Sequence, residues 1–271
     1  MEITRPDKGV KQVRKYRVWK VKTEYETIFY AKGGYCPKRQ GTKNYIWLAN
    51  EIVYWKFASF AGLRMPNVAL LRKRKDFFFG SEFCDGRAKL ENENALQASV
   101  DRVPDNNTQL TRALLLDIAL LNSDRVLSAI LKDRNNLLWF IDYDKSLWGD
   151  GMERENETEK PGDLDRINVK NLPEKVDAFL GDYAPREAKS MNKIVWTQEW
   201  TTIFEEFRKL PLDEATFHIA CSEVPEGWLP NPLPKKMLCF LKKWWSELEG
   251  LFVQDCFQQK MQDILTKRCK Y

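Results

Sequence analysis

The pattern of hydrophobic and polar positions divides the chain into a strand-rich first part and a helical second part. In the first part, four stretches have the alternation or the apolar content of strands: 16–22, 26–32, 65–71 and 77–83. Apolar residues at helical spacing predict one helix over 45–61, and Gly62 is typical of a helix C-terminus. We therefore expect a small sheet accompanied by one helix.

From about residue 86 the pattern becomes helical. Helices are predicted over 110–121, about 187–209, about 212–222, and from 235 to about 267. Two apolar arms, 127–131 and 137–141, flank a charged and Asn-rich turn, which predicts a β-hairpin among these helices. The order of elements indicates an α+β chain, with a small β-rich part followed by a larger and mostly helical part.

The predicted hairpin begins just after Asp124 and ends just before Asp142. If its arms pair symmetrically about the turn, residues whose numbers sum to about 268 face each other, so Asp124 opposes Asp144 and Asp142 opposes Val126. Three carboxylates that converge in this way repel one another unless a cation neutralises them, and a hard divalent metal prefers such oxygen ligands. The alternative is that these aspartates are ordinary turn and cap residues.

Composition limits the chemistry more than it limits the fold. The 271 residues can form one large domain or two lobes, and 43% hydrophobic with 31% charged residues is ordinary for a globular protein. Six cysteines include no Cys-x-x-Cys pair, so neither a zinc site nor a disulfide framework is indicated. The single histidine, His218, excludes histidine–metal clusters and makes a Ser-His-Asp triad a poor candidate. Any chemistry must therefore depend on carboxylates, lysine and arginine.

Charge and hydropathy indicate where the protein works. No apolar run reaches the roughly 18 residues that span a bilayer, and the start of the chain has no apolar signal segment, so we expect a cytoplasmic protein without membrane insertion. The net charge of +5 is concentrated, because residues 1–22 hold eight Lys or Arg against two acids and 72–75 form a second basic run. Such runs are usually solvated faces. A nucleic-acid partner is the other interpretation, and we do not favour it.

Two residues of the first part suit phosphoryl transfer, which requires positioned phosphates, metal ions and an oriented hydroxyl. Lys32 ends a predicted strand, where it could contact the phosphates of ATP. Glu51 lies in the predicted helix that follows, where it could pair with Lys32. Each residue also has a plainer interpretation, as a strand-end cation and an exposed helix carboxylate.

The residues around the hairpin supply the remaining parts of such a site. Asp124 would orient the acceptor hydroxyl, and Asp142 would hold Mg²⁺ with Asp144 as a second ligand. Arg125 could neutralise the carboxylates or contact a phosphate. The residues follow one another in the order that a kinase requires, which favours this interpretation over their separate occurrence by chance.

Several short pieces carry a resemblance to a known family: 29–32, 49–53, 60–66, 79–83, 121–125, 140–142 and 224–228. In these pieces the chain resembles the HipA-like kinase domain, a bacterial group related to the HipA toxin kinases and more distantly to phosphatidylinositol kinases. The resemblance covers roughly residues 26–260. It implies a two-lobed protein-kinase-like fold, with an N-lobe over 1–84 and a C-lobe over 85–271.

The resemblance also implies an activity and a nucleotide site. The expected reaction transfers the γ-phosphate of ATP, with Mg²⁺, to a Ser or Thr of a protein whose identity the sequence does not give. The interlobe hinge would be Glu82, Phe83 and Cys84, whose backbone would meet the adenine. A small-molecule or lipid kinase remains an alternative.

Two departures from the family pattern support a different alternative. Kinases place an Asn five residues after the catalytic Asp as a metal ligand, and this chain has Ala129 there. The family also favours a His after Asp-Arg, where this chain has Val126. A methyl group cannot bind magnesium, so the chain could be a pseudokinase that acts as a regulatory or interaction module. If it is active, we expect Asp144 to replace the lost ligand.

Overall fold

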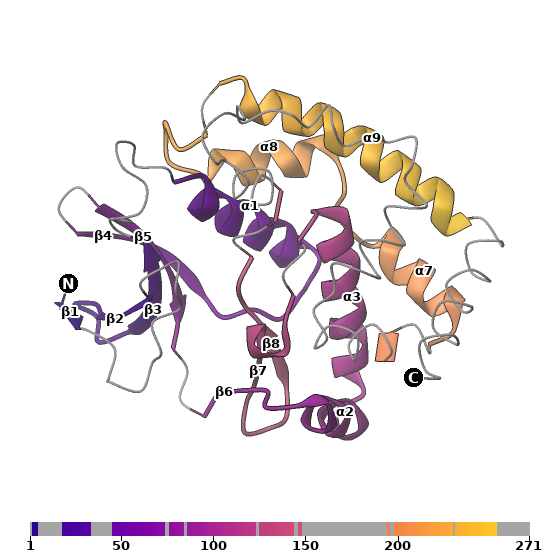
Figure 1. Ribbon diagram of the computed structural model, residues 1–271, viewed down its shortest axis with the longest axis horizontal. Helices are drawn as coiled ribbons and strands as arrows, with labels where there is room; N and C mark the ends of the chain where they lie inside the picture. The colour runs from indigo at the N-terminus through magenta and orange to yellow at the C-terminus, as the bar shows by residue number, and fades with distance from the viewer. Residues whose placement is uncertain are drawn as a thin grey trace, which may run out of the picture.

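The computed structural model has a small antiparallel sheet lobe beside a larger helical part (Figure 1). It describes residues 2–4, 18–33, 45–73, 76–83, 86–122, 125–143, 146–147, 194–195, 198–229 and 231–253. Within these residues the α+β class and the order of the two parts agree with the sequence prediction.

The sheet lobe contains five antiparallel strands in the spatial order β1-β2-β3-β5-β4. Their bounds are β1 Glu2–Thr4, β2 Val18–Lys22, β3 Ile28–Gly33, β4 Val68–Lys73 and β5 Asp76–Glu82. In the central strand β3, Lys32 pairs with Val18 on one side and with Phe79 on the other. The next residue is Gly33, at φ +141°, where a Cβ atom would lie 2.5 Å from the carbonyl oxygen of Phe77. The absence of a side chain there lets β3 approach β5 closely beside Lys32.

The two faces of this sheet have different partners. On one face, five buried side chains form a small cluster: Val21, Phe29, Ala31, Leu71 and Phe78. The alternation of a strand puts Lys32 on the opposite face with its neighbour Phe79, which packs against Leu48 and Ile52 of α1 (Ile46–Phe60). Lys32 therefore lies on the face of the sheet that is turned toward α1.

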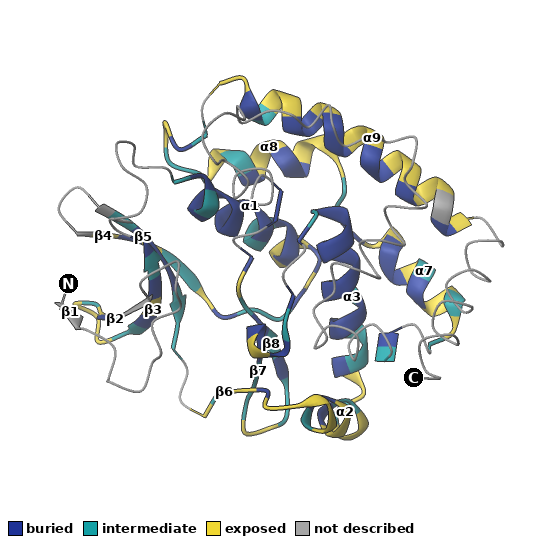
Figure 2. Ribbon diagram, in the orientation of Figure 1, coloured by how far each residue is buried: buried dark blue, intermediate teal, exposed yellow. Residues whose placement is uncertain are grey.

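Helix α1 lies between β3 and β4 in sequence but packs into the core of the helical part. Its buried residues Tyr54, Phe57 and Ala58 belong to the same hydrophobic cluster as residues of the C-terminal helices, and Figure 2 shows this helix largely buried. Phe57 meets Trp245 edge to face, and Lys56 forms an ion pair with Glu223 at 2.9 Å. The helix is thus fixed to the larger part along most of its length.

The helical part is built around α3, whose buried residues run along most of the helix. Its helices are α2 Glu93–Arg102, α3 Asp105–Ala119, α7 Trp200–Arg208, α8 Glu214–Ser222 and α9 Leu233–Val253. The indole N–H groups of Trp244 and Trp245 donate to the carbonyl oxygens of Ile118 and Ala119, both at 3.0 Å. A three-stranded sheet lies beside these helices, with β6 Ala88–Lys89, β7 Ile130–Lys132 and β8 Leu138–Phe140.

The hairpin is present and its strands overlap the predicted arms, but the predicted register is wrong. Ile130 pairs with Phe140 and Lys132 with Leu138, so the paired numbers sum to 270, and residues Leu127–Ala129 form a 3₁₀ turn before the strand. The side chain of Asp133 explains the register, because it accepts hydrogen bonds from the backbone N–H groups of Asn135 and Leu137. The turn is therefore centred one residue later than the charged segment suggests.

Other predictions from the pattern agree with the structure over the described residues. The strands near 16–22, 26–32, 65–71 and 77–83 and the helices near 45–61, 110–121 and 212–222 are confirmed within a few residues. The ends of two predicted helices, 187–193 and 254–267, lie outside the described residues. The sequence analysis did not predict β1, β6 and α2, and the predicted helix over 187–209 is interrupted at residues 198 and 199, before α7 begins. None of the described helices has the length and apolar character needed to cross a bilayer.

Candidate active site

Three charged side chains from distant parts of the sequence meet where the sheet lobe faces the helical part. Lys32 at the end of β3 extends its ammonium group to Glu51 of α1, with Nζ 2.5 Å from Oε1. The same ammonium group also binds Oδ1 of Asp142, which follows β8. The sequence analysis named all three residues, and the structure brings them into direct contact.

Glu51 is the buried member of this group. Its side chain is 1% exposed, and its second oxygen, Oε2, accepts a hydrogen bond from the backbone N–H of Tyr143 at 3.1 Å. Burial raises the pKa of Glu51 and the Asp142 carboxylate raises it further, while Lys32 opposes both effects. A buried carboxylate of this kind needs its cation, so Glu51 fixes the position of Lys32.

Asp142 is the accessible member, with 46% of its side chain exposed. Its backbone has φ +70°, in the left-handed region that non-glycine residues seldom occupy and that Asp and Asn tolerate best. Strained backbone is often found at functional sites, where the surrounding structure holds it. Asp142 thus presents a carboxylate to the space between the two lobes.

Next to these residues, a second group of charged side chains is fully buried. The Asp117 carboxylate on α3 is bound in a bidentate manner by the guanidinium of Arg125, with both N···O distances 2.8 Å. Burial opposes the charge on Arg125, but Asp117 outweighs burial and raises the pKa of the guanidinium. Arg125 also donates to the carbonyl oxygen of Ile141 at 2.8 Å, and its carboxylate partner is Asp117 rather than Asp142.

Two stacked tyrosines join this buried group to α1. Tyr54 of α1 donates its hydroxyl to Oδ1 of Asp117 at 2.7 Å, and its ring stacks on that of Tyr143 with the centroids 4.0 Å apart. Burial and the Asp117 charge raise the pKa of Tyr54, so the hydroxyl remains a donor. The sequence analysis missed Tyr54 and Asp117. The only signal for Asp117 was an acid inside an otherwise apolar helix segment, which predicts a buried ion pair.

The remaining predicted site residues fall into two groups. Asp124, Asp144 and Cys84 lie outside the described residues. Glu82 accepts a hydrogen bond from the side chain of Asn67 at 2.6 Å, and Phe83 donates its backbone N–H to the carbonyl oxygen of Ile28 at 2.8 Å. These two residues therefore lie at the end of the central strands, where the chain leaves the sheet lobe.

The residues present fit magnesium bound together with a nucleotide better than they fit a resident metal. Among the described residues, no three His, Cys, Asp or Glu side chains gather as a metal site. Magnesium, however, is commonly held by one or two carboxylates together with substrate phosphates and several waters. The half-exposed oxygens of Asp142 suit that use, with Lys32 beside them for the phosphates.

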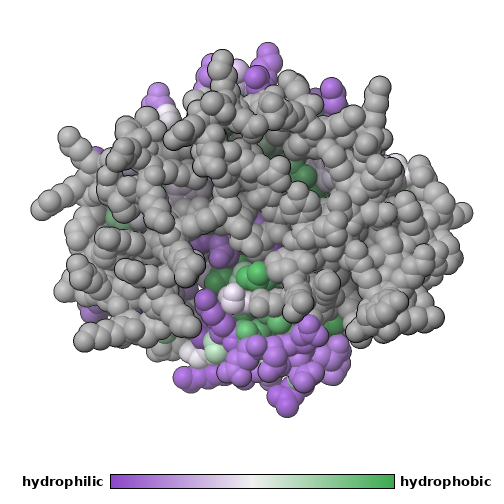
Figure 3. Space-filling view, viewed as in Figure 1, coloured by the Kyte–Doolittle hydropathy of each residue, from purple (hydrophilic) through white to green (hydrophobic). Residues whose placement is uncertain are grey.

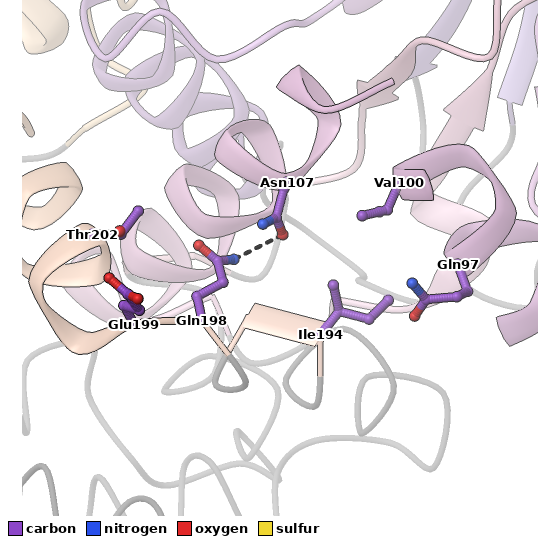
Figure 4. A pocket seen from close by; sticks show the side chains of 7 residues that line it. All are labelled: Gln97, Val100, Asn107, Ile194, Gln198, Glu199 and Thr202. Carbon is purple, nitrogen blue, oxygen red and sulfur yellow. Dashed lines mark hydrogen bonds between the residues drawn. The ribbon is translucent and has the colours of Figure 1, made fainter. Parts of the chain in front are cut away.

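The described surface also has a pocket of about 490 Å³ that is separate from these charges. It is lined by Gln97 and Val100 of α2, Asn107 of α3 and residues near the start of α7, where Gln198 donates to Asn107 at 2.8 Å (Figure 4). Asn107 lies ten residues before Asp117 on α3, about 15 Å away along the helix at the helical rise. Figure 3 shows hydrophobic side chains near the middle of this face, next to a group of hydrophilic ones.

Comparison with solved structures shows a similar fold. No family model matches the chain, and no curated protein matches it in sequence. Among solved structures it is similar to the Helicobacter pylori proinflammatory kinase CtkA, with a TM-score of 0.59 and 9% identity, over 97% of this chain and 96% of that one. A HipA structure from Shewanella oneidensis MR-1, in complex with HipB and operator DNA, also matches. It has a TM-score of 0.37 and 10% identity, over 82% of this chain and 60% of that one.

At 9% identity, the likeness to CtkA shows the fold alone. A TM-score of 0.37 is too low to add to that conclusion. The fold is the one that the resemblance to HipA-like kinases implied. The chain therefore has a two-lobed kinase fold, with Lys32, Glu51 and Asp142 meeting between its lobes.

Proposed function

We propose that the protein is an ATP-dependent kinase that transfers the γ-phosphate of ATP to a Ser or Thr hydroxyl of another protein. The observation that supports it most directly is the shared ammonium group of Lys32, bonded to both Glu51 and Asp142. Phosphoryl transfer requires a cation on the phosphates, a carboxylate that holds that cation and a second carboxylate for the metal. These three side chains come from β3, α1 and the segment after β8, as in a kinase.

Each residue has a distinct role in this proposal. Glu51 holds Lys32 in place, and Lys32 neutralises charge on the phosphates of ATP. Asp142, released from Lys32 when the phosphates arrive, supplies oxygen ligands on the cleft side. Magnesium, when bound, would neutralise charge on the phosphates as the bond to the leaving group breaks. Asp124, the neighbour of the buried Arg125, would orient the acceptor hydroxyl and take up its proton.

The proposed division of the chain places the N-lobe over 1–84 and the C-lobe over 85–271, with Glu82, Phe83 and Cys84 as the hinge. The N–H of Glu82 donates to Asn67 and that of Phe83 to Ile28, so a backbone N–H contact to adenine would come from Cys84. A cytoplasmic setting, where ATP and magnesium are abundant, and Asp144 as a second metal ligand belong to the same proposal.

A pseudokinase of the same fold is the second candidate, and Ala129 is the observation that favours it. Its side chain is 2% exposed, and its carbonyl oxygen accepts a hydrogen bond from Ile141 at 3.0 Å. Because a buried methyl group cannot bind a metal, Asp142 is the proposed metal ligand among the described residues. Under the kinase proposal this ligand set is sufficient, so Ala129→Asn should change transfer little once any loss of stability is taken into account. A large gain in transfer would favour the pseudokinase.

Two measurements test the proposal directly. Thermal unfolding with ATP, with and without Mg²⁺, should show stabilisation by the nucleotide that the metal increases. Incubation with radiolabelled ATP and a generic protein acceptor should show incorporated phosphate, which Asp124→Ala should abolish while nucleotide binding persists. Nucleotide binding without any transfer by the wild type would support the pseudokinase. Failure to bind nucleotide at all would reject the kinase and leave only a pseudokinase that acts without nucleotide.

A further inference from the structure

We propose that Tyr54 and Asp117 are positioning residues that fix both carboxylate segments of the site, Asp124 and Asp142, to helix α1. This inference rests on the proposed kinase function. Tyr54 lies three residues after Glu51, about one helical turn, so α1 presents both side chains to the helical part. Helix α1 would then position Lys32 through Glu51, and the segments around Asp124 and Asp142 through Tyr54.

The contacts of Asp117 extend to both sides of Asp124 in sequence. Before Asp124, the side chain of Asn122 donates to Oδ1 of Asp117 at 2.7 Å. After it, the guanidinium of Arg125 binds both oxygens of the same carboxylate. The two residues that bracket the proposed catalytic segment are therefore held by one buried acid on α3.

The same group also holds the chain on both sides of Asp142. Arg125 donates to the carbonyl oxygen of Ile141, the residue before Asp142. Tyr143, the residue after it, stacks on Tyr54 and donates its backbone N–H to Glu51. A single network thus reaches the flanks of Asp124 and of Asp142, and it is linked to α1 through Tyr54 as well as through Glu51.

Packing alone does not account for this choice of residues. Asp117, Arg125 and Tyr54 are all at most 5% exposed, and burying such charges costs free energy that apolar residues of similar volume would avoid. The Tyr54 hydroxyl adds one directed bond to a carboxylate that already has a bidentate cation. Its removal should therefore loosen the geometry of the two loops more than it disturbs the core.

Tyr54→Phe removes only the hydroxyl and keeps the stacked ring. We expect kcat for phosphate transfer to fall about tenfold or more, with KM for ATP changed less than about twofold, since Lys32 and Glu51 are untouched. In the nucleotide-free protein, hydrogen exchange should become about tenfold faster at the backbone amides of Asn122 and Tyr143, which donate to Asp117 and Glu51. A residue that only fills space would produce neither this split between kcat and KM nor the local change in exchange.

Tyr45→Phe is the matched control. Tyr45 precedes the first residue of the same helix and stacks on Trp228 with centroids 4.7 Å apart, and within the described residues its hydroxyl forms no hydrogen bond. We expect this variant to keep the wild-type kcat, KM and exchange rates within about twofold. An equal effect of the two variants would show that loss of a tyrosine hydroxyl on α1 acts generally, and would overturn the inference.

The two readouts separate this inference from the proposed function. If the wild type transfers no phosphate, the kinase proposal fails, and the exchange rates alone decide whether Tyr54 positions the two loops. If the wild type is active, an unchanged kcat in Tyr54→Phe overturns the inference, and so do unchanged exchange rates. The inference is supported if kcat and the exchange rates both change in Tyr54→Phe and neither changes in Tyr45→Phe.

Discussion

The backbone N–H of Tyr143 donates to Oε2 of Glu51 at 3.1 Å, which bonds α1 directly to the residue after Asp142. The other oxygen of the same carboxylate binds Lys32 from the central strand of the sheet. One side chain therefore fixes the strand lysine and the backbone beside the proposed metal ligand at once. In the described part of the chain, α1 is also buried against the C-terminal helices, which fixes Glu51 relative to the helical part.

Removal of Lys32 tests the phosphate contact. We expect Lys32→Ala to lower the rate of phosphate transfer by about 10²–10³-fold, which is the usual effect of losing a group that stabilises charge in the transition state. Affinity for ATP should also fall, as measured by the nucleotide-dependent thermal shift. Since Glu51 then lacks its cation, the variant should also be less stable in urea, and activity should be compared only for the folded fraction.

Lys22 provides the control for this change. It lies on the neighbouring strand β2, 44% of its side chain is exposed, and it pairs with Glu26 at the surface. Lys22→Ala should leave transfer and ATP binding within about twofold of the wild type, because exposed ion pairs contribute little. Equal losses in the two variants would contradict a specific role for Lys32.

Asp142→Asn tests the metal ligand without disturbing the backbone. Asn tolerates the left-handed conformation at φ +70° nearly as well as Asp, so the substitution removes the charge and keeps the turn. We expect the additional stabilisation that Mg²⁺ gives to the ATP-bound protein to disappear, while stabilisation by ATP alone remains. Unchanged magnesium dependence in a thermal-shift titration would reject Asp142 as the ligand.

The parts of this site that depend on regular periodicity could be predicted from the sequence. Strand alternation correctly predicted the strand that ends near Lys32, and helical spacing correctly predicted the helix around Glu51. That the two side chains face each other follows from the placement of these two elements. The hairpin register could not be obtained in this way. It depends on the Asp133 side chain and on a 3₁₀ turn at Leu127–Ala129, and neither changes the apolar pattern.

The buried network around Asp117 was also beyond the reach of periodicity. Tyr54 fits an amphipathic helix as an apolar residue, so nothing in the pattern reveals that its hydroxyl meets Asp117 from 63 positions away. Arg125 likewise looks like a solvent-facing or phosphate-binding cation in sequence, whereas its described carboxylate partner is buried. Contacts between side chains far apart in sequence become visible only when the chain is folded.

A cluster of three aromatic rings predicts how the loop after α8 contributes to stability. Trp228 stacks on Tyr45 at 4.7 Å and meets the ring of Phe77 at 5.5 Å, which ties this loop to α1 and to β5. Trp228 is 5% exposed, so Trp228→Ala should lower the free energy of unfolding by about 3–5 kcal/mol. Denaturation in urea measures this change.

The control for that change is an exposed apolar residue on the preceding helix. Ile219 of α8 is 44% exposed, and Ile219→Ala should change the free energy of unfolding by no more than about 1 kcal/mol. If Trp228→Ala cost no more than this control, the aromatic cluster would not contribute to the stability of the fold.

The raised pKa of Glu51 predicts how stability depends on pH. Burial is its main cause, the charge of Asp142 adds to it and Lys32 opposes it, so the folded protein holds this proton more tightly than the unfolded chain. The resulting stabilisation is complete below the ordinary pKa of 4.5 and is lost as the pH rises through the folded pKa. The free energy of unfolding of the wild type, relative to Glu51→Gln, should therefore decrease between acidic and neutral pH.

Urea titrations of the two proteins at several pH values measure that difference, and Asp142→Asn supplies an internal check. Without the Asp142 charge, one cause of the raised pKa is gone, so the decrease with pH should be smaller in this background. A difference that stays flat with pH would mean that Lys32 only balances burial. A difference that increases with pH would mean that Lys32 outweighs burial and that the folded protein favours the ionised carboxylate. In that case Glu51 would be held as part of a net favourable ion pair, and the position of Lys32 would be fixed at no cost to the fold.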